Sequence, residues 1–277
     1  MTAHLADGRG VREKFLEYKA AATRDDARYQ NFCNELKYVR RLIAVKRSLR
    51  LLDVACGPGA FTEFWIEHGF DASGVDIDPS LLEAAKRRLE ARGMTARLAV
   101  GRVERLPFGD GSFDVCVANA VLEHIPDWQA MLREITRVLN GGGILVLCTS
   151  NRLHPFQREV NNFPFYPWIP ARLKTRILAY IMKHRPDLVN YTDLPAVNWF
   201  TYEELRAFLE GLGFSVSTRL DMVRRSDLTG WKAALAPVLD LLQRVRVLRY
   251  LYYFYADDSS VYAVKKSSTH GYATRVA

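Results

Sequence analysis

Short apolar runs alternate with helix-length amphipathic segments between Leu51 and Thr149, and this alternation restricts the chain to few folds. Each apolar run has the length of a buried strand, whereas the segments between them repeat their apolar residues with helical spacing. Strands that alternate with helices form crossover units and a parallel sheet. The expected strands are residues 51–55, 72–77, 96–100, 115–118 and 143–149, and the expected helices are residues 61–68, 80–92 and 128–139.

Two later segments depart from this alternation. Prolines interrupt aromatic and basic residues over 151–198, and a second irregular segment spans about 225–258, so we interpret both as helical lid insertions. Between them, Thr201 to Glu204 has the pattern of a capping box that opens a helix ending at Gly211. Further strands are expected at 214–220 and 260–264, and Gly141-Gly142-Gly143 is typical of a stop and turn.

The length of 277 residues and the hydrophobic share of 49% suit one large domain with a single main core. Apolar residues at helical spacing predict an N-terminal helical region over 1–48, which precedes the main domain over 49–267. The polar residues 268–277 are expected to form a loose tail.

Charge and cysteine usage limit the partners of the chain. The net charge of +8 favours an anionic partner, cofactor or membrane surface, but the basic residues are scattered without a nucleic-acid-binding motif, so no nucleic acid is expected. The four cysteines are far apart and predict neither a disulfide framework nor a metal site. Without a signal pattern or a long apolar stretch, we expect a cytoplasmic protein, either soluble or peripheral to the inner face of a membrane.

A glycine turn follows the first expected strand. Leu51 to Val54 can form a buried strand, and Cys56-Gly57-Pro58-Gly59 can turn the chain directly into a helix that begins near Ala60. Glycine allows a sharp turn and a close approach to a ligand, and the helix N-terminus presents free N–H groups. Such a turn also occurs for purely structural reasons, so it is weak evidence by itself.

An acidic residue ends the next strand, in Gly74-Val75-Asp76-Ile77-Asp78. A carboxylate at this place can accept hydrogen bonds from both hydroxyls of a ribose. Asp76 is favoured for that role, because Asp78 precedes Pro79 and Ser80 and has the pattern of a helix N-cap. The third glycine of a dinucleotide-binding loop is missing, which argues against an NAD-dependent oxidoreductase.

Four blocks in this order resemble the class I S-adenosylmethionine-dependent methyltransferases, in particular those of ubiquinone and menaquinone biosynthesis. The resemblance covers Leu51 to Ser150 and implies a Rossmann-like doubly wound α/β sheet, mostly parallel with one antiparallel strand. The antiparallel strand would be 260–264. The blocks are the glycine turn with its strand (51–59), residues 74–78, Leu106-Pro107-Phe108-Gly109-Asp110-Gly111-Ser112-Phe113-Asp114, and Val121-Leu122-Glu123-His124-Ile125.

The resemblance also implies a cofactor-binding set with S-adenosylmethionine as methyl donor and no metal. Asp53 and the turn would hold the methionine part, Asp76 the ribose, the segment from Arg102 to Glu104 the adenine, and Asn119 and Ala120 the sulfonium and substrate side. The full set is Asp53, Ala55, Cys56, Gly57, Gly59, Asp76, Ile77, Arg102, Val103, Glu104, Asn119 and Ala120.

Two members of this set depart from the family pattern. Many members carry glycine in place of Ala55, which still adds little bulk beside the cofactor. Arg102 stands where relatives commonly place an aspartate that accepts from the adenine amino group, and arginine has no acceptor. The adenine would then depend on the Val103 backbone and on apolar walls.

Methyl transfer requires mainly a nucleophile held in line with the methyl group, and a base only if the nucleophile must lose a proton. His124 and His154 are the candidate bases. The structural alternatives are a helix-start histidine that packs beneath the cofactor loop for His124 and an exposed loop histidine for His154. Glu123 can likewise be a first-turn acid that favours the helix dipole.

The aromatic and basic residues of the first insertion, such as Phe165 and Trp168 followed by Arg172 and Lys174, suit either a lid over an apolar substrate or a membrane interface. We therefore expect methyl transfer, by O-methylation, to a small hydrophobic or lipid-like molecule. The alternatives are C- or N-methylation and a catalytically silent scaffold that binds the cofactor and a partner.

Overall fold

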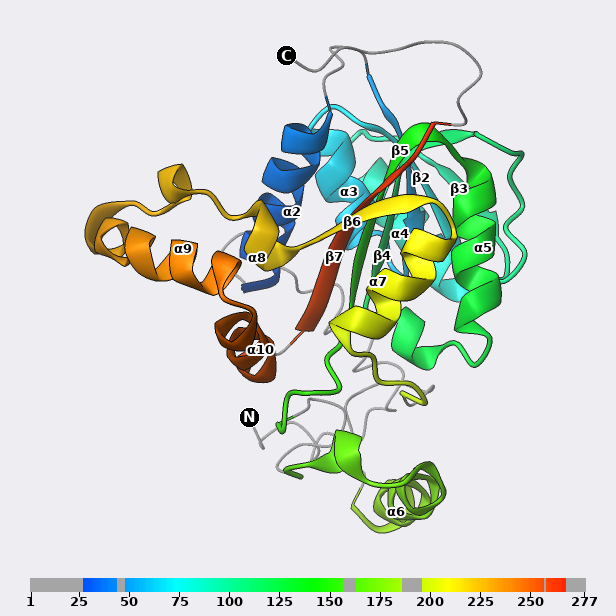
Figure 1. Ribbon diagram of the computed structural model, residues 1–277. Coiled ribbons are helices and arrows are strands. Elements are labelled where there is room, and N and C mark those ends of the chain that lie inside the picture. Colours follow the sequence, from blue (N-terminus) through cyan, green and yellow to red (C-terminus); the bar gives the residue numbers. More distant parts are fainter. Residues whose placement is uncertain (1–26, 44–47, 157–162, 186–195, 257, 268–277) are drawn as a thin grey trace.

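A computed structural model of the protein describes residues 27–43, 48–156, 163–185, 196–256 and 258–267 (Figure 1). Seven strands form one sheet in the order β3-β2-β1-β4-β5-β7-β6. The first five run parallel, and β7 runs antiparallel to both β5 and β6. The predicted fold class is therefore confirmed. The strands are β1 (Arg50–Val54), β2 (Asp71–Asp76), β3 (Arg97–Val100), β4 (Phe113–Asn119), β5 (Leu139–Ser150), β6 (Phe214–Thr218) and β7 (Asp258–Lys265).

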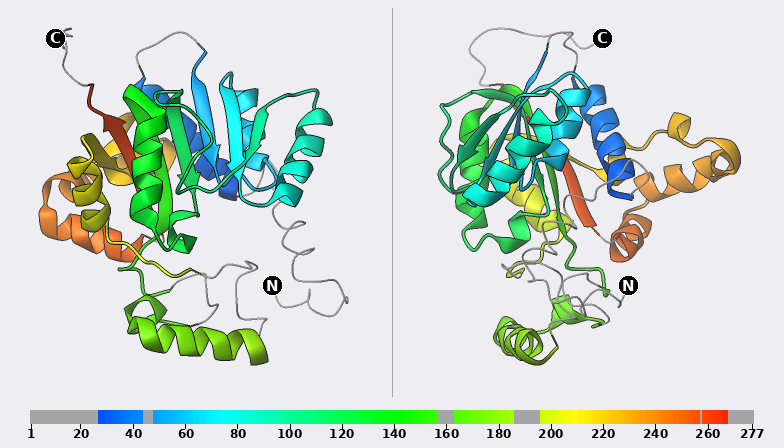
Figure 2. Two further views of the ribbon diagram at one scale, coloured as in Figure 1. Left: turned by 90° about the vertical axis from the view of Figure 1, so that its right-hand side faces the viewer. Right: turned by 180° about the vertical axis from the view of Figure 1, so that it is seen from behind.

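Helices cover both faces of the sheet (Figures 1 and 2). The helices α2, α3 and α4 lie on one face, and α5 and α7 lie on the other. Their bounds are α2 (Ala27–Leu42), α3 (Ala60–Glu67), α4 (Pro79–Glu90), α5 (Trp128–Val138), α6 (Ala171–His184), α7 (Tyr202–Gly211), α8 (Arg219–Met222), α9 (Ala236–Arg244) and α10 (Arg246–Tyr255). Short 3-10 helices are η1 (Leu122–His124), η2 (Tyr166–Trp168), η4 (Arg225–Asp227) and η5 (Gly230–Leu235).

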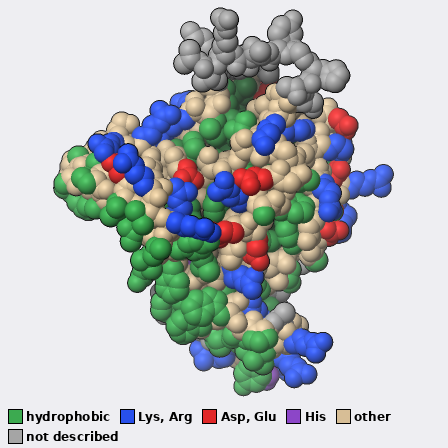
Figure 3. Space-filling model, in the orientation of Figure 1, with side chains coloured by type: hydrophobic (Ala, Val, Ile, Leu, Met, Phe, Trp, Pro, Cys, Tyr) green, Lys and Arg blue, Asp and Glu red, His purple; other side chains and the backbone are tan. Residues whose placement is uncertain are grey.

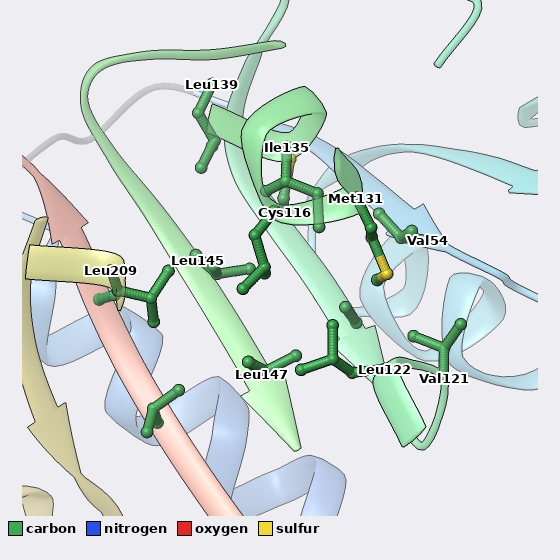
Figure 4. Close-up of a cluster of buried hydrophobic side chains, with 14 of the residues drawn as sticks. Val54, Cys116, Val121, Leu122, Met131, Ile135, Leu139, Leu145, Leu147 and Leu209 are labelled. Atoms are coloured by element: carbon green, nitrogen blue, oxygen red, sulfur yellow. The ribbon is translucent and has the colours of Figure 1, made fainter. Parts of the chain in front are cut away.

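Two hydrophobic cores arise because successive strand residues point to opposite faces of the sheet. Leu52 faces the core beneath α5 and α7, whereas its neighbour Leu51 faces the core beneath α2 and α3. In the first core, Met131 and Ile135 of α5 lie over the strands (Figure 4). The fully buried Trp65 of α3 anchors the second core.

Predicted helix caps are present in the structure. The Asp78 carboxylate accepts from the Ser80 backbone N–H at 2.8 Å and begins α4. At α7 the Thr201 hydroxyl accepts from the Glu204 N–H at 3.2 Å, and the Glu204 carboxylate accepts from the Thr201 N–H at 2.8 Å. Each cap satisfies N–H groups that the helix itself leaves without partners.

Two sequence-based boundaries were wrong. The Gly141-Gly142-Gly143 run lies within β5 instead of forming a separate turn, because Leu139 already pairs with Phe113 and the register shifts before Val115 pairs with Ile144. The strand expected over 214–220 ends at Thr218, where a second capping box with Asp221 begins the short helix α8. Local side-chain caps therefore ended the strand two residues early.

Both insertions leave the sheet at its carboxyl edge, where Ser150 of β5 pairs with Asp258 of β7. Asn151 joins them: its side-chain amide donates to the carbonyl oxygens of Tyr253 at 2.5 Å and Ala256 at 2.7 Å. The second insertion is also tied to α2, because Arg41 donates to both carboxylate oxygens of Asp227, which holds the pKa of that carboxyl well below its usual range.

The first insertion carries its own small apolar cluster around Tyr166 and Ile181. Its helix α6 lies beyond the carboxyl edge of the sheet (Figures 1 and 2). Within the described ranges, no helix is both long and apolar enough to cross a bilayer.

We expect Asn151→Asp to lower the free energy of unfolding by about 2–4 kcal/mol, because it removes a buried donor shared by two carbonyl oxygens and places a charge beside them. Chemical denaturation measures this change. The matched control Asn31→Asp changes an exposed residue of α2 and should stay within about 0.5 kcal/mol of the parent protein. Equal stabilities of the two variants would contradict the assigned role of Asn151.

Candidate functional site

The candidate site lies at the carboxyl ends of β1, β2, β3 and β4. Strand order reverses between β1 and β4, and ligands of doubly wound sheets bind at such a switch point. The turn after β1 is held by the Cys56 N–H, which donates to the Val75 carbonyl at 3.0 Å, and by the Gly59 N–H, which donates to the Cys56 carbonyl at 3.1 Å. The first of these hydrogen bonds fixes the turn to β2, and the second closes the turn itself.

The residues of the turn have different structural tasks. Gly59, at a φ of 76°, allows close helix packing, since a Cβ there would lie 2.8 Å from the Ala85 Cβ of α4. Gly57, at a φ of 53°, has nothing within 4 Å of the place of a Cβ, so its backbone is open to a ligand. The buried Cys56 side chain packs toward Gly74 of β2, which leaves only the backbone of Cys56 for a ligand. Ala55 has a left-handed φ of 58°.

Asp76 connects this turn to the next loop. One oxygen of its buried carboxylate accepts from the Gly57 N–H at 2.9 Å, and the other accepts from the Asp78 N–H at 2.9 Å. Each carboxylate oxygen has two acceptor sites, so Asp76 retains capacity for further donors. The structure thus brings Gly57 and Asp76 together at one edge.

Two apolar side chains are left uncovered beside Asp76. Ile77 is 54% exposed, and Val100, the register partner of Asp76 on β3, is 57% exposed. Together they offer an apolar surface for a flat ring. The sequence had singled out Ile77 but missed Val100, although Val100 ends an expected strand at the ligand-facing edge.

The segment after β3 separates into a buried and an exposed part. Val103 is buried, whereas the guanidinium of Arg102 points outward and pairs with Glu104 at 3.1 Å. The Arg102 side chain is thus held by its neighbour in the chain.

Asp53 is a buried carboxyl below the turn. Its Oδ2 accepts from the Thr62 hydroxyl of α3 at 2.6 Å. Burial raises the pKa of Asp53 to about 7, and the charge of Asp76 adds to this effect, while the Thr62 hydrogen bond opposes it. Thr62 was not foreseen, although it lies in the first turn of the helix that follows the glycines.

The end of β4 meets the N-terminal helix. The Asn119 side-chain amide donates to the two oxygens of the buried Glu35 of α2 at 3.3 and 3.1 Å. The amide oxygen of the Asn119 side chain, Oδ1, is buried and has no hydrogen-bond partner among the residues that the structure describes. Ala120 follows in a left-handed conformation with a φ of 50°. Glu35 was not identified as a site residue from the sequence. The sequence signal for it was a carboxylate next to Leu36 on the apolar side of a helix.

The two candidate histidines lie on different loops past the carboxyl edge. His124 ends η1 after β4, and its Nδ1 is buried without a hydrogen-bond partner in the described part of the chain. The Nδ1 of His154, after β5, lies 3.4 Å from the Phe254 carbonyl oxygen, and its ring contacts Phe156. The first insertion thus begins beside the second one.

Glu123 is buried and accepts from the Thr149 hydroxyl of β5 at 2.7 Å. Its backbone carbonyl accepts from the N–H groups of Val197 and Asn198. Glu123 therefore connects η1, β5 and the segment before α7. It is a buried structural residue and not an exposed acid in the first turn of a helix.

Comparisons with known proteins place the chain among methyltransferases. A family described as "Methyltransferase domain" matches residues 52–147. Demethylmenaquinone methyltransferase of Tropheryma whipplei (strain Twist) is 33% identical over 175 residues, which cover 63% of this chain and 70% of the relative. Malonyl-[acyl-carrier protein] O-methyltransferase of Serratia marcescens is 29% identical over 176 residues, covering 59% of this chain and 63% of the relative.

Among solved structures, an S-adenosylmethionine-dependent methyltransferase from Mesorhizobium loti superposes with a TM-score of 0.52 at 18% identity. The match covers 84% of this chain and 98% of that one. At this identity the likeness concerns the fold.

Asp53 gives the stability of the protein a defined pH dependence. Since its pKa rises from 3.8 to about 7 on folding, the folded state binds more protons between these values, and stability falls as pH increases through that window. In Asp53→Asn this fall should be absent, so the difference in free energy of unfolding between parent and variant should shift by up to about 4 kcal/mol from pH 4 to 8. Urea denaturation across this range measures it. A constant difference would show that Asp53 stays ionised.

Proposed function

Because the chain belongs to the class I S-adenosylmethionine-dependent methyltransferases, we propose that it methylates an oxygen of a small hydrophobic or lipid-like molecule. The observation that carries the cofactor site is the pairing of the open Gly57 backbone with the buried Asp76 carboxylate at the switch point of the sheet. The names of its relatives support the acceptor class, since one is a demethylmenaquinone methyltransferase and another an O-methyltransferase of an acyl-carrier conjugate.

The residues present fit the cofactor. In this proposal, Asp53 and the turn of Ala55, Cys56, Gly57 and Gly59 hold the methionine part, and Asp76 binds the ribose hydroxyls. Ile77 and Val100 form the apolar walls of the adenine site, as their exposure suggests. Val103 supplies backbone groups there, since Arg102 is engaged by Glu104.

S-adenosylmethionine supplies an electrophilic methyl group on a sulfonium. The chain contributes by holding the donor and the acceptor in line and by excluding water. Asn119 and Ala120 line the acceptor side in this proposal. Glu35 acts as a positioning residue, because its carboxylate fixes the Asn119 amide and so directs the unpartnered Oδ1.

The residues of the cofactor site do not determine which atom of the acceptor is methylated, so methylation of carbon or nitrogen is the alternative reaction. A protein that binds the cofactor and a partner without catalysis is the alternative of another functional class. Calorimetry with S-adenosylmethionine and its demethylated product tests the site, and mass spectrometry with a labelled methyl group locates the methylated atom. Binding of neither compound by folded protein would overturn the proposal. Binding without turnover of hydroxylated quinones, acyl conjugates and other apolar acceptors would favour the scaffold.

We expect Asp76→Ala to weaken S-adenosylmethionine binding by about 1.5–3 kcal/mol per lost hydrogen bond, because these bonds involve a charged acceptor. Asp78→Ala is the matched control, since it removes a neighbouring carboxylate that caps α4. The control should cost about 1 kcal/mol of folding stability and leave affinity within twofold. Calorimetry measures affinity and thermal melting reports folding. Similar losses of affinity in both variants would contradict the assignment of Asp76 to the ribose hydroxyls.

O-methylation of a hydroxyl that must lose its proton requires a base, and we expect His124→Gln to lower kcat by about 10²–10⁴ with little change in donor affinity. His124 is favoured because its buried Nδ1 has no hydrogen-bond partner among the described residues. His154→Gln tests the second candidate. His68→Gln, at the end of α3, is a control in which kcat should be retained. Full activity in both His124→Gln and His154→Gln would exclude these two histidines as the base.

A further inference from the structure

The two insertions, which are far apart in the sequence, share one exposed apolar surface. The Trp168 ring of η2 lies 6.1 Å from the Phe254 ring of α10, and it also contacts Phe165, while Phe254 contacts Tyr255. The Trp168 indole N–H donates to the Arg152 carbonyl at 2.8 Å, which fixes the ring in place. We call the surface formed by η2, α9 and α10 the aromatic face.

The helices of the second insertion each have two apolar sides. Leu239 of α9 is buried, and Tyr253 of α10 is buried in the first core of the domain. Other apolar residues, spaced three or four apart along the same helices, remain exposed on the outer side. They are Val238 and Leu241 of α9 and Val247, Leu251 and Tyr255 of α10, preceded by Trp231 and Leu235 of η5.

In Figure 3, hydrophobic side chains gather over α9 and α10 and continue below them toward α6. Val247 is 69%, Trp231 76% and Tyr255 77% exposed. A soluble protein rarely leaves so many large apolar side chains together in water unless they meet a partner.

Positive charge surrounds the aromatic face. Over residues 228–256 there are four basic residues and a single acidic one, Asp240, which is paired with Arg225. The exposed Lys232, Arg244 and Arg246 form no ion pair with a described residue. Helix α6 carries four basic residues and no acidic one. Aromatic and aliphatic side chains bordered by Lys and Arg are the composition of an interfacial membrane anchor.

We propose that the aromatic face docks on an anionic lipid bilayer, with its apolar side chains at the boundary of headgroups and acyl chains and its basic residues against the lipid phosphates. Charge favours this occupant over a second copy of the chain, because a symmetric dimer through the face would oppose Lys232, Arg244 and Arg246 to the same cations. If the proposed function also holds, the carboxyl edge would face a membrane-resident acceptor, since both insertions leave the sheet there.

Vesicle flotation of the full chain tests the docking without any methyl transfer. Vesicles of phosphatidylcholine with about a third phosphatidylglycerol should carry the protein, more salt should release it, and phosphatidylcholine alone should carry much less. Absence of flotation with the anionic vesicles would overturn the proposal. Dimerisation in solution through this face would also overturn the proposal. Light scattering of the parent protein and of the variants described next detects such a dimer.

Two variants separate the charged and the apolar contributions. Lys232→Gln/Arg244→Gln/Arg246→Gln should weaken binding to anionic vesicles by about 100-fold, as expected for three basic residues. Val247→Ser/Leu251→Ser/Tyr255→Ser should reduce binding to both kinds of vesicle. The control Lys86→Gln/Arg87→Gln/Arg92→Gln removes three exposed charges from α4 and the residues just after it, and should bind like the parent. Equal binding by all variants would overturn the proposal.

Trp231 and Trp168 provide a readout that a loss of folding cannot imitate. Their fluorescence should shift to the blue on addition of anionic vesicles and be quenched by brominated lipid. Trp231→Phe/Trp168→Phe should remove most of this response, whereas the buried Trp65 should contribute none. An unchanged spectrum of parent protein that floats with the vesicles would place the contact elsewhere and contradict the proposal. Donor binding by calorimetry, measured on each variant, keeps this result separate from a failure of the proposed function.

Discussion

The carboxylate of Asp76 holds together the two backbone turns on which the candidate site depends. It accepts one N–H from the turn after β1 and one from the loop after β2, so the two turns keep a fixed distance. A buried carboxylate is costly without such donors, and charge-assisted bonds to backbone N–H groups offset that cost. Parallel pairing of Asp53 with Gly74 and of Val54 with Val75 sets the register that makes this bridge possible.

Much of the fold could be predicted from the sequence because the parallel strands and their helices are local patterns. The strand over β1, the cap at Asp78 and the capping box at Thr201 each depend on residues within a few positions. The importance of Glu35 and the exposure of Val100 could not be read in this way, since both result from contacts between segments far apart in the chain. The roles given to the cofactor-binding residues and to the two histidines stay predictions. The N-terminal region before α2 and the tail lie outside the described residues.

The two departures from the family pattern have physical consequences of different size. Ala55 occupies a left-handed conformation, which costs a residue with a Cβ roughly 1–2 kcal/mol and which glycine adopts freely. That cost is small beside the packing of two full cores, so the turn is retained. Arg102 alters the chemistry of the site and not the stability of the turn. A hydrogen-bond acceptor of the family pattern is replaced by a cation, and the Glu104 carboxylate pairs with that cation. The apolar pair Ile77 and Val100 then becomes the larger contribution to an adenine site in the proposed function.

The antiparallel direction of β7 determines where the second insertion can lie. Because β6 runs antiparallel to β7, β6 ends at the carboxyl edge with Thr218 paired to Val261, and β7 begins there with Asp258 paired to Ser150. The connection between them therefore starts and ends at the edge that carries Gly57 and Asp76. A β7 parallel to β5 would have required the chain to return to the opposite edge. One reversed strand thus places any segment inserted before it next to the ligand-facing side of the sheet, and the hydrogen bonds of Asn151 join that segment to the first insertion.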